Sequence, residues 1–257
     1  MCYEASQLAY RIYKDAIRLK ASPEEVAYLK EKWEQLKEGH QALYHASGHA
    51  HPTFTVFIEK DKTLELELCT WGLIPHWVKD EEQAKDLWNK TLNARGESLL
   101  EKPSFKQAAE NGRCVIPLDG FFEHHHKNGK TFPHFIKHKD QRSLFVAGLR
   151  SNWINPVTGE ESNTCTIVTT KGNELMSHIH NNPKLNEPRM PLVLDDVSAR
   201  DWLHADTSIQ ELIQPYDKEE LSAWTVKRLR GKMYVGNTEE AHKEHHYDEM
   251  NDPLTLF

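Results

Sequence analysis

Long hydrophobic runs are missing from this chain of 257 residues, since no stretch approaches the roughly 18 apolar residues that a membrane-spanning helix needs. The N-terminus lacks the basic-then-apolar pattern of a secretory signal peptide. Cysteine is scarce, because the four cysteines at positions 2, 69, 114 and 165 form no CxxC pair and are too few for a disulfide scaffold. We therefore expect a cytoplasmic globular protein that does not bind membranes.

Motifs that hold cofactors are missing as well. No glycine-rich loop could cradle a phosphate, which argues against a nucleotide cofactor. The histidine-rich runs at His124–His126 and His242–His246 contain neither HExxH nor a paired CxxC site, and consecutive histidines in a strand point to opposite faces. We expect no metal and no small-molecule cofactor.

The charges of the chain are unevenly distributed. The 32 Lys and Arg against 39 Asp and Glu leave a net charge of −7, which argues against nonspecific coating of nucleic acid. Residues 85–150 nevertheless hold twelve basic and seven acidic residues, whereas residues 237–252 hold six acidic residues and one lysine. The basic middle could follow a phosphate backbone, although scattered solvated lysines explain it equally well.

Hydrophobic periodicity predicts an α+β fold. Apolar residues recur at helical spacing over 8–17 and 26–36, and Ser22-Pro23-Glu24-Glu25 is typical of a capped helix start. Strand-like runs include 64–68, 114–116, 131–136, 144–147, 165–169 and 192–194, and further helical patches lie near 103–110, 173–178 and 197–203. Because strands and helices do not alternate regularly, we predict a largely antiparallel, barrel-like β core flanked by helices. A single domain would cover 1–236, and 237–257 would form a mobile acidic tail.

Five local motifs stand out along the chain. They are Cys2 after the initiator methionine, WGLIPHW at 71–77, NARGE at 93–97, RCVIPLDGFFE at 113–123, and His180-Asn181 followed by RMP at 189–191. Each motif alone has a structural explanation, such as a Trp-Gly turn at the edge of a core or an Asn that caps a helix.

Together and in this order, the motifs resemble the SRAP family, the SOS response-associated peptidase domain. The resemblance runs from Cys2 to the helix near Trp202 and implies a single α+β domain with a barrel around a DNA-binding channel. It also implies covalent capture of abasic sites in single-stranded DNA, a self-processing peptidase step that removes Met1, AP-lyase activity and a place in the DNA-damage response. The sequence departs from the family where Tyr3-Glu4 replace the usual Gly-Arg and His124 replaces the usual Trp.

The chemistry of an N-terminal cysteine fits this resemblance. Its α-amine, with an ordinary pKa of about 7.7–8.0, can form a Schiff base with the aldehyde of an abasic sugar, and its thiol can close a thiazolidine ring. The resemblance implies that Glu123 holds and deprotonates the amine and assists removal of Met1. It likewise makes His180, rather than the nearby His178, the acid that opens the sugar, and gives Asn93 the role of orienting the sugar or the Cys2 backbone.

The same resemblance implies a set of DNA contacts. Arg95 and Arg189 would bind phosphates, and Trp71 and Trp77 would stack on bases beside the lesion. The expected partner is single-stranded DNA containing abasic sites, and the protein would be a monomer that associates with the nucleoid when it binds DNA.

Two other functions compete with this hypothesis. The chain could be a thiol peptidase that acts on other proteins, with Cys2 as an ordinary nucleophile, or a noncovalent module that binds single-stranded DNA. The absence of a separate Ser or Cys nucleophile with an orienting pair argues against the peptidase. The intact set of Cys2, Asn93, Glu123 and His180 argues against the noncovalent module.

Overall fold

The computed structural model describes residues 2–204 and 207–250. Its helices are α1 (Ile12–Arg18), α2 (Pro23–Leu36), α3 (Glu81–Trp88), α4 (Lys106–Asn111), α5 (Glu174–Ile179), α6 (Asp196–Leu203) and α7 (Ile209–Leu212). Its strands are β1 (Glu4–Gln7), β2 (Leu43–Ser47), β3 (Thr53–Lys60), β4 (Thr63–Trp71), β5 (Asn93–Arg95), β6 (Arg113–Leu118), β7 (Gly120–Lys127), β8 (Lys130–His138), β9 (Leu144–Ile154), β10 (Glu161–Lys171), β11 (Arg189–Pro191), β12 (Val193–Leu194) and β13 (Leu221–Thr225).

Two sheets form the β core. The smaller sheet has the strand order β13-β8-β7-β1-β2. In the larger sheet β10 pairs with both β4 and β9, so β10, β4, β3, β6 and β9 close into a five-stranded barrel. Most pairs are antiparallel, and only β10 with β4 and with β5 runs parallel. The predicted α+β domain with a barrel-like, largely antiparallel core is confirmed.

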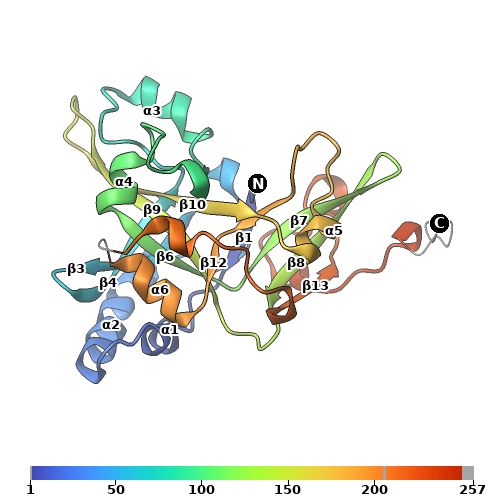
Figure 1. Cartoon of the computed structure of the whole chain (residues 1–257), viewed down its shortest axis with the longest axis horizontal. Helices are drawn as coiled ribbons and strands as arrows, with labels where there is room; N and C mark the ends of the chain where they lie inside the picture. The colour runs from blue at the N-terminus through green and yellow to red at the C-terminus, as the bar shows by residue number, and fades with distance from the viewer. Residues whose placement is uncertain (1, 205–206, 251–257) are drawn as a thin grey trace.

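The helices cover the outside of the barrel. Figure 1 shows α1 and α2 at one end beside β3 and β4, α6 alongside β6 and β9, and β7, β8 and β13 on the opposite side of the molecule. Along β6 the side chains alternate, because Cys114 and Ile116 belong to one buried cluster and Val115 belongs to a second cluster under the helices. This alternation gives the barrel wall two apolar faces.

Local signals in the sequence placed two of these elements correctly. The Ser22 side chain accepts from the Glu25 backbone at 3.2 Å and the Glu25 carboxylate accepts from the Ser22 backbone at 2.8 Å, which completes the expected capping box of α2. Asn128 and Gly129 have φ values of 51° and 72° and join β7 to β8, as a two-residue hairpin turn requires.

Strand β1 was not predicted, because its sequence EASQ has no apolar alternation. Its polar side chains are buried and find partners far along the chain. Ser6 donates to the Leu43 carbonyl at 2.9 Å, and Gln7 donates to the Thr55 carbonyl at 2.8 Å and accepts from the Thr55 backbone at 2.7 Å. A buried strand can therefore be polar when each side chain is satisfied by a specific bond.

The C-terminal segment differs from the expected mobile tail. Residues 237–250, the part of the tail that the structure describes, pack against the smaller sheet. The His242 ring stacks on Phe135 with centroids 4.2 Å apart, and the Trp224 indole donates to the His242 carbonyl at 2.7 Å. Residues 251–257 lie outside the described residues. Among the helices that are described, none is long and apolar enough to cross a bilayer.

Candidate active site

Strand pairing brings the N-terminus to the predicted site. Strand β1 lies between β2 and β7, with Glu4 opposite Phe122 and Ala5 opposite Phe121. Extending this antiparallel register toward the N-terminus carries Cys2 and Tyr3 alongside Glu123 and its neighbour on β7. In this register Tyr3 falls opposite Glu123 and Cys2 opposite His124, so the sheet brings the predicted nucleophile to the region of the predicted base, close enough for the charge of Glu123 to act on the thiol.

The Cys2 thiol is buried, with 1% of the residue exposed, and donates to the Glu4 carbonyl at 3.5 Å. Burial raises its pKa to about 12, and the negative charge of Glu123 adds to the rise. The thiol is consequently protonated at neutral pH. Any reaction of its sulfur must move the proton during the step rather than start from a stable thiolate.

Glu123 and His180 form the centre of the site. The Nδ1 atom of His180 lies 3.5 Å from Oε2 of Glu123, and Oε1 of Glu123 accepts from the His124 backbone at 3.0 Å. Burial raises the pKa of Glu123 from 4.5 to about 7. A carboxyl group with this pKa can give or take a proton near neutrality.

His180 differs from its expected form. It is held through Nδ1, 2.9 Å from the Arg189 carbonyl, and burial lowers its pKa from 6.5 to about 4. We expected an imidazolium that donates a proton, but neutral imidazole prevails at physiological pH. The lowered pKa of His180 disfavours the imidazolium form that the expectation requires, and Glu123, 3.5 Å away, is a second group of the pair that can carry a proton.

Asn93 begins β5, which runs parallel to β10. Both its amide oxygen and its amide nitrogen are buried and have no hydrogen-bond partner among the described residues. Leaving such a group unsatisfied costs about 1–3 kcal/mol. An amide held in this way is suited to bind a substrate group that supplies the missing partners.

The predicted DNA contacts fall into two classes. Arg95 is exposed and Trp77 is half-buried, so both can reach a ligand. Trp71 is 0% exposed and donates through its indole to the Leu92 carbonyl at 2.7 Å. Its burial does not agree with the expectation that it stacks on a base, because no face of the ring is open.

Arg189 also differs from the expectation. Its guanidinium is 3% exposed and makes a two-pronged ion pair with Glu97, with both distances 2.9 Å. It further donates to the Thr169 carbonyl at 2.8 Å. These bonds occupy both Nη groups, while Nε is buried without a partner in the part of the chain that the structure describes, so the guanidinium is not open to a phosphate; the Arg189 backbone instead holds His180.

Sequence reasoning missed an ionic cluster around Glu4, which is buried. Its carboxylate contacts His124 at 2.7 Å, Arg230 at 3.0 Å and His45 at 3.7 Å. Burial alone would raise the pKa of Glu4, but hydrogen bonds from His124 and His45 outweigh it and hold the pKa well below its usual range. The signal was present, since Glu4 and His124 are the positions where the sequence departs from the family pattern.

A cavity of about 510 Å³ opens beside these residues. Its lining includes Tyr3, Glu123, His180, Arg228 and Arg230. His124 and His126 line it as well, while His125 on the other face of β7 contacts the His178 carbonyl at 2.9 Å, as predicted for consecutive histidines in a strand. A substrate in this cavity would meet Glu123 and His180, whereas Cys2 lies buried one residue behind the lining residue Tyr3.

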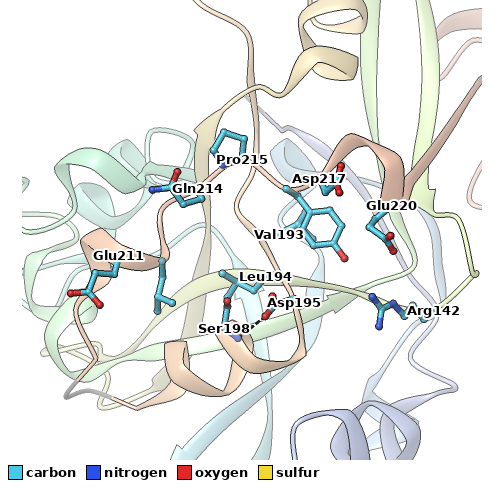
Figure 2. A pocket seen from close by; sticks show the side chains of 12 residues that line it. Arg142, Val193, Leu194, Asp195, Ser198, Glu211, Gln214, Pro215, Asp217 and Glu220 are labelled. Carbon is cyan, nitrogen blue, oxygen red and sulfur yellow. Dashed lines mark hydrogen bonds between the residues drawn. The ribbon is translucent and has the colours of Figure 1, made fainter.

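A second cavity, of about 380 Å³, holds none of the predicted site residues. Figure 2 shows Arg142 and Glu220 at one end of it and Glu211 at the other. His138, Asp140 and Glu220 lie close enough there to share a metal ion. However, Arg142 donates to His138 at 2.8 Å and Lys139 pairs with Glu220 at 2.9 Å, so cations already occupy two of these three potential ligands.

Comparisons with known proteins agree with this architecture. The family described as SOS response associated peptidase (SRAP) matches residues 15–233. The Abasic site processing protein YoqW of Bacillus subtilis (strain 168) is 38% identical over 193 residues, covering 72% of this chain and 81% of that protein. The Abasic site processing protein HMCES of Gallus gallus is 35% identical over 153 residues, covering 52% of this chain and 43% of that protein. A crystal structure of a protein from Bacteroides thetaiotaomicron is 29% identical and superposes with a TM-score of 0.78, covering 95% of this chain and 100% of that chain.

Proposed function

The chain belongs to the SOS response-associated peptidase family, and from that premise we propose that it processes abasic sites in DNA. We further propose that it does so by covalent capture, through the N-terminal amine and the thiol of Cys2. The observation that supports the proposal is the position of Cys2 shortly before β1, where the charge of Glu123 acts on its thiol and its neighbour Tyr3 lines the cavity of about 510 Å³ together with Glu123 and His180.

The proposed sequence begins with hydrolysis of the Met1–Cys2 peptide bond. Water adds across the bond, free methionine leaves, and the α-amine of Cys2 becomes the new N-terminus. Glu123 is suited to take the proton from the attacking water and return it to the leaving amine, because its pKa of about 7 permits both directions.

Capture then joins the amine to the abasic sugar. Opening of the sugar ring exposes the aldehyde, a step that the Glu123–His180 pair can assist by giving a proton to the ring oxygen. The amine nitrogen attacks the aldehyde carbon, and loss of one water leaves a Schiff base. The thiol finally adds across the C=N bond, with sulfur going to carbon and its proton to nitrogen, which closes the thiazolidine.

The high pKa of the Cys2 thiol suits this last step. Addition of S–H across an imine consumes the proton within the step, so no stable thiolate has to form. An ordinary thiol peptidase that acts on other proteins needs an accessible thiolate. The high pKa of the Cys2 thiol therefore does not favour that alternative.

Intact-mass measurement tests the proposal. After incubation with a single-stranded oligonucleotide containing one abasic site, the protein should lack Met1 and gain the mass of the oligonucleotide minus one water. Cys2→Ala should give no adduct, Cys2→Ser should give at most a heat-labile imine, and the internal buried-thiol control Cys69→Ala should give the full adduct. A heat-stable adduct on the Cys2→Ala protein would overturn the proposal.

A further inference from the structure

Arg228 lies in the same cavity as Glu123 and His180, on the segment that follows β13. The segment is firmly held on both sides of the arginine. The Val226 backbone donates to the Pro133 carbonyl at 2.9 Å, and Leu229 is buried. Arg228 therefore occupies a defined position at the wall of the cavity, although it is 105 residues from Glu123 in the sequence.

The guanidinium of Arg228 is fixed by uncharged partners. Its carbon lies 5.5 Å from the ring centroids of both Phe132 and Tyr247, and its Nη1 donates to the Thr131 carbonyl. Within residues 2–204 and 207–250, no carboxylate oxygen comes within 4.0 Å of it. The charge of Arg228 acts on the Glu249 carboxylate from a distance, but that carboxylate makes its ion pair with Lys130, at 3.0 Å.

Two other arginines close to Glu123 and His180 are paired with carboxylates. Arg230, also in the cavity lining, pairs with the buried Glu4, and Arg189 pairs with Glu97. The histidine whose pKa is lowest there, His180, is neutral at physiological pH because of its burial. Arg228 is thus a positioned cation whose charge is not balanced by a contacting carboxylate.

We propose that Arg228 binds a phosphate of the single-stranded DNA next to the abasic sugar. This inference rests on the proposed function and names a contact residue for it. A planar guanidinium with one N–H committed to Thr131 still offers N–H groups to the oxygens of a phosphodiester. The contact takes the place of the one expected from Arg189, whose guanidinium is buried and paired with Glu97.

The test is an equilibrium titration with single-stranded DNA that carries a tetrahydrofuran abasic analogue. This analogue has no aldehyde, so the titration reads binding without capture. Arg228→Gln should weaken binding about 5- to 20-fold at low salt. It should also reduce the slope of log K against log salt concentration by about 0.7, the value for one phosphate contact on a single strand.

The matched control is Lys232→Gln, which removes the same charge from an exposed position on the same segment outside the cavity. Arg228→Met keeps the apolar stem against Phe132 and Tyr247 and should show the same reduction of the salt slope as Arg228→Gln. Arg228→Lys, which keeps the charge, should show a smaller reduction.

Equal affinity and equal salt slope for Arg228→Gln and Lys232→Gln would overturn the assignment. If the wild-type protein formed no adduct at all, covalent capture would fail, yet the titration with the tetrahydrofuran analogue would still decide the role of Arg228. The two failures are therefore distinguishable.

Discussion

Replacement of Glu123 by glutamine should make the protein more stable and less active. The carboxyl group is buried at the site, and burial raises its pKa from 4.5 to about 7. Between these two pH values the folded protein holds a proton on Glu123 that the unfolded chain has released. The free energy of unfolding consequently falls as the pH rises through this window and levels off above it.

The size of the effect follows from the shift. One pKa unit corresponds to 1.36 kcal/mol, so the ionised Glu123 costs the folded state roughly 3 kcal/mol at most above neutrality. Glutamine has the same shape, can still accept from the His124 backbone, and does not ionise. The difference in unfolding free energy between Glu123→Gln and wild type should grow by roughly 2–3 kcal/mol from about pH 5 to about pH 8.

Urea unfolding of both proteins at several pH values measures this difference, and the rate of adduct formation measures the accompanying loss of activity. Glu110→Gln, an exposed carboxylate on α4, makes the same chemical change without burial and should show no such growth. A constant difference for Glu123→Gln across the range, or a less stable variant at pH 8, would refute the reasoning.

Three further predictions concern residues around the site. Trp71→Ala should lower the free energy of unfolding by about 3–5 kcal/mol, because it empties a core position, and thermal melts measure this loss. Trp77→Ala should mainly weaken the binding of single-stranded DNA, which an equilibrium titration measures. Glu4→Gln should destabilise the protein at neutral pH by about 1–3 kcal/mol. The difference should begin to shrink only as the pH falls below about 4.5, where the unfolded chain takes up the proton, and should disappear only below the lowered pKa of Glu4 in the folded protein. His180→Gln should slow adduct formation without changing the product. His178→Ala should be nearly silent, since the His178 ring packs on His125 and does not line the cavity that contains Glu123 and His180. Equal losses of rate would move the role to His178.

Much of the fold and of the site follows from short stretches of sequence. The capping box at Ser22 and Glu25 and the turn at Asn128 and Gly129 depend on bonds between near neighbours, so their local sequence is sufficient. The order of the motifs from Cys2 to the RMP segment likewise indicated the family, because each motif is a contiguous run. The α+β class followed from the periodicity of the strands and helices.

Only the tertiary structure decided which side chains are open to a ligand and which are already paired. Trp71 and Arg189 looked like DNA contacts in the sequence, but one fills the core and the other is bound to Glu97. Glu4 gains partners 41, 120 and 226 residues away, and Arg228 reaches the site through a segment near the end of the chain. Burial and ion pairing arise from contacts between segments that are distant in the sequence, so a local sequence pattern cannot predict them.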